Sequence, residues 1–129
     1  MIILKSFIYV LIWTILFITF GFYVANGVGD FTNGYKNKVT IIENHIEEDN
    51  WDDAKIVLKD ISDSWDKEKS IWYKLLNHES FDLISLHFNI LDKSINTKDK
   101  SKASENIEII KITLGNILEN EKCDLNHIL

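Results

Sequence analysis

Apolar residues recur along most of the chain at alternating spacings of three and four, which is the pattern of a helix with one buried face. The clearest run is WDDAKIVLKDISDSWDKEKSIW, residues 51–72, in which an aromatic or aliphatic side chain returns every seven residues. The pattern predicts a long helix from Trp51 to about Asn77. Its predicted core residues are Trp51, Ala54, Leu58, Ile61, Trp65, Trp72 and Leu75.

Three further segments, 31–46, 81–95 and 103–117, carry stripes of the same period, and short polar stretches separate them. Four such stripes with short connections predict an all-α fold, an antiparallel four-helix bundle. Residues 121–129 predict a short amphipathic tail folded back onto the bundle. The start of the second helix, Asn50–Ala54, also resembles the opening of a helical-hairpin repeat, but no clear internal period recurs, which disfavours a repeat protein.

The N-terminal segment is uncharged from Ser6 to Gly29 and is almost entirely apolar from Phe7 to Phe22. A bilayer core of roughly 30 Å requires about 20 apolar residues of a spanning helix. We therefore expect residues 1–29 to be a transmembrane signal anchor with a glycine-containing hinge, and residues 30–129 to be the helical-bundle domain. The first bundle helix either continues directly from the membrane helix or pivots at the glycines. The alternative is a signal peptide cleaved near Gly27, which would release a secreted domain.

The orientation of this anchor follows from its short N-terminal tail. Lysines on the two sides of the apolar segment nearly balance, so the positive-inside rule does not decide. A five-residue tail before a long apolar segment is typical of bacterial signal anchors. We expect a single-pass protein of the cytoplasmic membrane, with its N-terminus in the cytoplasm and its bundle outside.

Composition narrows the classes of function. The chain contains no proline, only five glycines and a formal charge of -6, with all its basic residues being lysines. An acidic surface argues against nucleic acid as a partner, because nucleic-acid binding requires clustered Lys and Arg. Cys123 is the single cysteine, which excludes an internal disulfide, a cysteine metal cluster and a lipoprotein anchor.

The polar cluster His78, Glu79 and Asp82 is the strongest candidate for chemistry. Histidine and aspartate four residues apart could share a helix face, but the sequence HESFD lacks the second histidine of a zinc-protease motif. Contacts with the neighbouring helix ends account for these residues more simply. No nucleophile elbow, Walker sequence or Cys–His pair is present. The sequence therefore predicts neither an enzyme, nor a cofactor, nor a metal site.

The third helix carries a second apolar face, formed by Leu83, Leu86 and Ile90. A helix that is apolar on two sides is central in its fold or is covered by something else. The favoured function is a non-enzymatic, membrane-anchored accessory module that contacts a membrane protein or a second copy of itself. The alternative is a sensor whose bundle holds a small ligand in a pocket near Trp65 and Trp72.

Several of these features occur together in one known family. They are the N-terminal apolar segment, the run EDNWDDA at 48–54, the tryptophans Trp65 and Trp72, the turn HESFD at 78–82 and the closing LNHIL at 125–129. This combination resembles the uncharacterised family called domain of unknown function 4363, which occurs in low-GC Gram-positive bacteria. Its genes lie beside genes for multi-span membrane proteins, so the resemblance implies a membrane partner by association. It implies no activity.

Overall fold

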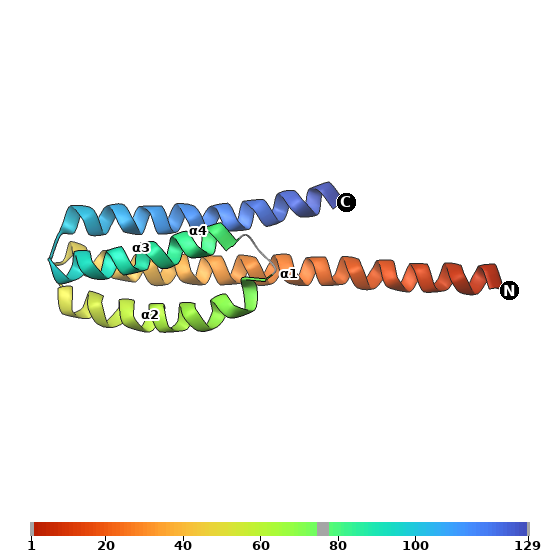
Figure 1. Ribbon diagram of the computed structural model, residues 1–129, viewed down its shortest axis with the longest axis horizontal. Helices are drawn as coiled ribbons and strands as arrows, with labels where there is room; N and C mark the ends of the chain where they lie inside the picture. Colours follow the sequence, from red (N-terminus) through yellow and green to blue (C-terminus); the bar gives the residue numbers. More distant parts are fainter. Residues whose placement is uncertain (1, 75–77, 129) are drawn as a thin grey trace.

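A computed structural model describes residues 2–74 and 78–128, with the side chains of residues 25 and 120–128 left undescribed. These residues form four α-helices and no strand (Figure 1). The helices are α1 (Ile2–Glu47), α2 (Trp51–Trp72), α3 (His78–Asn96) and α4 (Lys100–Ile128). The predicted all-α fold is confirmed.

The helices alternate in direction, and each packs against the next one in the chain. The last helix, α4, returns to pack against α1, which closes the arrangement into an antiparallel four-helix bundle (Figure 1). Of the two bundle ends, we call the one with the 48–50 and 97–99 turns the distal end. The opposite end, from which the N-terminal half of α1 leaves the bundle, is the proximal end.

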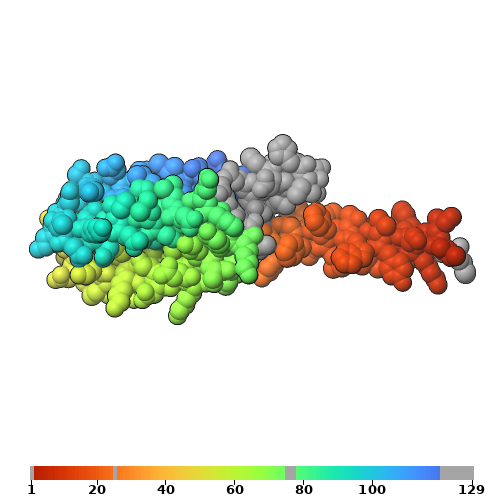
Figure 2. Space-filling view, in the orientation of Figure 1, coloured from red at the N-terminus to blue at the C-terminus, as the bar shows by residue number. Residues whose placement is uncertain are grey.

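The 46 residues of α1 form one uninterrupted helix, about 69 Å long at 1.5 Å per residue. Residues 2–23, which we call the apolar segment, project from the bundle as a narrow rod (Figure 2). The rest of α1 packs in the bundle, beginning at Val24. The helix passes through Gly27 and Gly29, neither of which has positive φ. Of the two alternatives left open by the sequence, a direct continuation and a pivot, the structure has the direct continuation.

The core is a single cluster of side chains from all four helices. Each helix contributes a stripe at spacings of three and four, as the sequence pattern predicts. The buried aliphatic residues of α3 and α4, for example Leu91 and Ile110, fill the distal half and the side of the core next to α4. Among the described residues, every buried side-chain nitrogen or oxygen has a hydrogen-bond partner.

Both distal turns have the same backbone geometry. After α1, the N–H of Asn50 bonds to His45 O at 2.8 Å, and Asp49, with φ 59°, bonds to Ile46 O. After α3, Asp99 bonds to Ser94 O at 2.9 Å, and Lys98, with φ 54°, bonds to Ile95 O. This pair of bonds around a left-handed residue is the Schellman motif. Here it is closed by aspartate and lysine instead of the usual glycine.

These turns belong to two matching helical hairpins, α1–α2 and α3–α4. Ile46 and Ile95 are separated by the same number of residues in the sequence as Ala54 and Ala103. All four side chains are buried. At the same interval, each other buried residue of α2 has a buried counterpart in α4: Leu58 with Ile107, Ile61 with Ile110, and Trp65 with Leu114. The bundle is thus built from two copies of one backbone unit, a repeat that the residue types conceal.

The helix boundaries differ from the predicted ones in three places. The second helix ends at Trp72 instead of about Asn77, and the predicted core residue Leu75 lies outside the described residues. The residues of the predicted C-terminal tail continue α4 as far as Ile128 without a break. Bundle packing starts at Val24, ahead of the predicted boundary at residue 30. Continuous helices replace the expected hinge and tail because no proline or turn interrupts hydrogen bonding at either position.

Candidate functional site

An aromatic cluster around Trp65 fills the proximal half of the bundle. The indole of Trp65 is almost fully buried and stacks against Phe31 of α1 at 5.5 Å and Phe81 of α3 at 5.4 Å, measured between ring centroids. The rings of Tyr35 and Phe88 meet the indole edge-on at 5.1 and 5.7 Å. Each aromatic pair adds about 0.5–1.5 kcal/mol beyond the burial of its area. Trp65 therefore joins three helices at one point.

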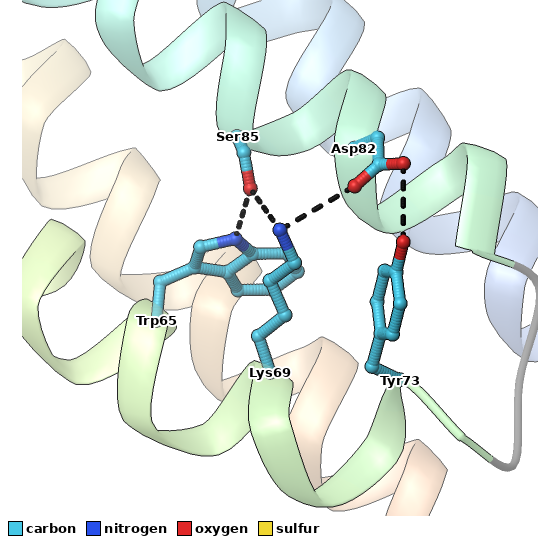
Figure 3. A network of polar contacts seen from close by, with 5 residues as sticks. All are labelled: Trp65, Lys69, Tyr73, Asp82 and Ser85. Carbon is cyan, nitrogen blue, oxygen red and sulfur yellow. Dashed lines mark hydrogen bonds and ion pairs between the residues drawn. The ribbon is translucent and has the colours of Figure 1, made fainter.

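A polar network lies beside this cluster and connects α2 to α3 (Figure 3). Trp65 Nε1 donates to Ser85 Oγ at 2.9 Å, and Lys69 Nζ donates to the same oxygen at 3.3 Å. Lys69 also forms an ion pair with Asp82 at 3.4 Å, and the hydroxyl of Tyr73 donates to the other oxygen of Asp82 at 3.4 Å. The network satisfies the indole N–H and fixes the register of the two helices.

The predicted polar cluster of His78, Glu79 and Asp82 is divided among other contacts. The imidazole of His78 stacks on the ring of Tyr73, with centroids 4.0 Å apart and planes inclined by 6°. Asp82 is held by Lys69 and Tyr73, and Glu79 is exposed. Within residues 2–74 and 78–119, where the side chains are described, no group of three His, Cys, Asp or Glu side chains could hold a metal ion. The geometry of the described residues supplies neither a metal centre nor an acid–base pair.

The fold changes the pKa of the buried Tyr35 hydroxyl. Its hydroxyl shares a hydrogen bond of 2.9 Å with Ser64 Oγ. Burial raises the pKa of Tyr35 to about 12; the Ser64 hydrogen bond lowers it, whereas the negative charges of Glu68 and Asp66 raise it. The hydrogen bond between the Tyr35 and Ser64 hydroxyls joins α1 to α2. Glu68, which interrupts the apolar register of α2, is half-buried beside it.

A shallow groove of about 170 Å³ runs between α2 and α3 next to Trp65. Its lining residues are Ser62, Trp65, Asp66, Ser85, Phe88 and Asn89. Trp72, the other tryptophan expected near a ligand pocket, does not line it. Small-molecule sites typically enclose about 300–1,000 Å³, so this groove is smaller than a usual ligand pocket.

The predicted seam of α2 divides into a buried and a half-buried part. Ala54, Leu58, Ile61 and Trp65 are buried, whereas Trp51 and Trp72 are half-buried against the core. Trp72 packs its ring edge onto Gly27 of α1 so closely that a Cβ at residue 27 would lie 2.8 Å from Cη2 of the indole. This contact, and the roles of Lys69 and Ser85, were not predicted from the sequence.

The predicted second face of α3 is open to solvent. Leu83 and Leu86 are 40 % and 52 % exposed, and Ile90 is half-buried. The adjacent helix α4 adds Ile112, also exposed. Next to this face, His87 Nδ1 lies 2.8 Å from Asn106 Oδ1, which ties α3 to α4. The structure thus leaves these leucines uncovered on a well-packed helix.

Together, the fold and its contacts define a class of protein: one long apolar helix that continues without interruption into an antiparallel four-helix bundle closed by an aromatic core. By length and composition alone, the first helix could cross a membrane, either as an anchor or as a signal sequence. The chain belongs to the family whose model is described as "Domain of unknown function (DUF4363)", which matches residues 22–128. No curated protein matches the chain, and no solved structure does.

Proposed function

We propose that this protein is a non-enzymatic interaction module that α1 anchors in the cytoplasmic membrane, with its bundle on the outer face. The observation that carries the proposal is the continuity of α1, whose exposed apolar half and bundle half form one helix. In water the apolar segment would expose a row of large side chains from Ile2 to Tyr23. A bilayer supplies the cover that this segment lacks.

Packing at the proximal end favours an uncleaved anchor over a signal peptide. The candidate cleavage position, Gly27, lies inside the helix and against the Trp72 ring, and Val28 next to it is fully buried. Cleavage there would remove Val24 from the bundle core. A segment that contributes to the packing of the mature domain is better retained than removed.

The exposed face of Leu83, Leu86 and Ile90 supports the interaction role. Large aliphatic side chains on the surface of a packed helix are a common feature of protein contact sites. We propose that this face contacts a second copy of the chain or a membrane protein. Ligand sensing is less well supported, because the groove beside Trp65 is small and the described core has no unsatisfied polar group.

Anchoring and orientation are tested together on intact cells. The variant Ser101→Cys, in a Cys123→Ser background, places a lone thiol at an exposed distal position. A membrane-impermeant maleimide labels this variant in intact cells if the bundle is outside, and only after lysis if it is inside. The mass of the recovered protein reports cleavage. Cleaved protein in the medium would contradict the anchor, and labelling only after lysis would contradict the orientation.

The contact face is tested by light scattering of the full chain in detergent. Leu86→Glu is compared with Ile56→Glu, a matched change at an isoleucine of α2 that is 62 % exposed. Self-association through α3 predicts an oligomer that Leu86→Glu dissociates and Ile56→Glu leaves intact. A monomer for all three proteins, with no membrane protein cross-linked to position 86 in cells, would refute the interaction role.

A further inference from the structure

The uncharged part of α1 overlaps the part that packs in the bundle. Residues 6–29 carry no charged side chain and extend for about 36 Å at 1.5 Å per residue. This exceeds the roughly 30 Å thickness of a bilayer hydrocarbon core. Bundle packing nevertheless begins at Val24, before Asp30, the first charged residue after Lys5. A hydrophilic spacer between the bilayer and the bundle is therefore missing from α1.

The end of α2 lies level with this overlap. Trp72 packs against Gly27, which places the last turn of α2 level with the C-terminal end of the uncharged part of α1. Ile71, in the same turn, is 65 % exposed although it is a large aliphatic residue. Trp72 and Tyr73 are half-buried, and Tyr23 is exposed on α1 just below them. Tryptophan and tyrosine are enriched where a membrane protein crosses the head-group layer.

We propose that the proximal end of the bundle is a lipid-contact surface that sits in the phospholipid head-group layer. Ile71 enters the boundary of the acyl chains, and the rings of Tyr23, Trp72 and Tyr73 lie among the head groups. The inference deepens the proposed function, since it rests on anchoring of the protein by α1. Its partner is the bilayer surface itself.

The contacts at this end indicate why a bilayer fits better than another protein. The continuous helix α1 fixes the height of Gly27, and the contact with Gly27 fixes the height of Trp72 relative to the apolar segment. Lys67 near the end of α2 and Lys74 in the turn after it are exposed, and their ammonium groups can reach phosphate oxygens. The hydrogen bond from the Tyr73 hydroxyl to Asp82 keeps the polar end of this side chain away from the acyl chains.

Two isoleucines of α2 provide a matched test of this placement. Ile71 and Ile56 are 65 % and 62 % exposed and lie about 22 Å apart along the helix. Each is replaced by cysteine in the full chain with Cys123→Ser and labelled with an environment-sensitive fluorophore. The proteins are reconstituted in phosphatidylcholine vesicles, with and without lipid that carries a nitroxide near its head group. Because both side chains are exposed, neither change removes a core contact.

The proposal predicts blue-shifted emission and several-fold stronger nitroxide quenching at position 71 than at position 56. Equal, weak quenching at both positions would overturn it, and so would equal, strong quenching, which would mean that the bundle lies flat on the membrane. A third label at Phe17→Cys reports the anchor separately, through lipid that carries the nitroxide deep in the acyl chain. Quenching at 17 without quenching at 71 would overturn the lipid-contact surface alone. Absence of both would overturn the anchor as well.

Discussion

The contact between Trp72 and Gly27 gives the sharpest test of the packing. An alanine at residue 27 would bring Cβ to 2.8 Å from Cη2 and 3.2 Å from Cζ2 of the indole. Carbon atoms in optimal contact are about 3.5–4.0 Å apart, so the ring must move by several tenths of an ångström. Overpacking of this kind costs about 1–3 kcal/mol.

The control is Gly34→Ala on the same helix. A Cβ at residue 34 meets no atom within 4 Å, so this substitution shows the gain in helix propensity alone, about 1 kcal/mol in favour of alanine. Gly27→Ala has the same gain but also the overlap with Trp72. We expect Gly34→Ala to stabilise the protein and Gly27→Ala to be about 1–3 kcal/mol worse than its control.

The free energy of unfolding is measured on the full chain in detergent, by denaturant titration followed by circular dichroism. Trp72→Phe removes the two ring atoms that the new Cβ would meet, so in that background Gly27→Ala should stabilise as much as Gly34→Ala does. If Gly27→Ala and Gly34→Ala stabilise the otherwise unchanged protein equally, the close approach of α2 to α1 is wrong, and so is the height assigned to the end of α2.

Three further predictions concern polar contacts. Tyr35 is neutral in both folded and unfolded chains below pH 10.0, but from there to about pH 12 only the unfolded chain loses the proton. Wild type should therefore lose stability relative to Tyr35→Phe in this window, and a pH-independent difference would contradict the raised pKa. Ser85→Ala leaves the N–H of Trp65 without its acceptor and should cost about 1–3 kcal/mol by denaturant titration, whereas no loss would mean that another acceptor replaces the hydroxyl. Lys111→Met breaks the 3.3 Å pair with Glu43 and should cost up to about 1 kcal/mol in low salt; a cost that persists in about 1 M salt would refute an electrostatic origin.

The helices and their buried faces follow from periodicity alone, because apolar residues at spacings of three and four line one face of a helix, and that face is buried in water. Their relative register does not follow. Phe31, Trp65 and Phe81 belong to three predicted stripes, but their meeting in one aromatic cluster depends on how the helices slide against one another. Ser85 and Lys69, which complete the cluster, are ordinary polar residues in the sequence, and no local pattern distinguishes them.

The sequence alone does not decide whether α1 is continuous, because the helix propensity of its glycines and the packing of α2 against them favour different outcomes. Each glycine in a helix costs about 1 kcal/mol relative to alanine, which favours a pivot at Gly27 and Gly29. Trp72 packs where a side chain at Gly27 would stand, and this contact favours the straight helix. The hairpin repeat was hidden for a related reason. Burial matches between its halves, but the residue types match only in part: the pairs at Ile46, Ala54 and Ile61 are identical, whereas Leu58 corresponds to Ile107 and Trp65 to Leu114.

The single helix that forms both the apolar segment and one wall of the bundle also acts mechanically as a lever. Its bundle half, from Val24 to Glu47, is about 35 Å long. Transmembrane helices tilt by about 20° on average, and a tilt of that size displaces the distal turns sideways by on the order of 12 Å. With α1 anchored in a bilayer as proposed, Asp49 and Lys98 at those turns would move furthest when the anchor tilts. In that arrangement, bilayer thickness would set the sideways position of the distal end.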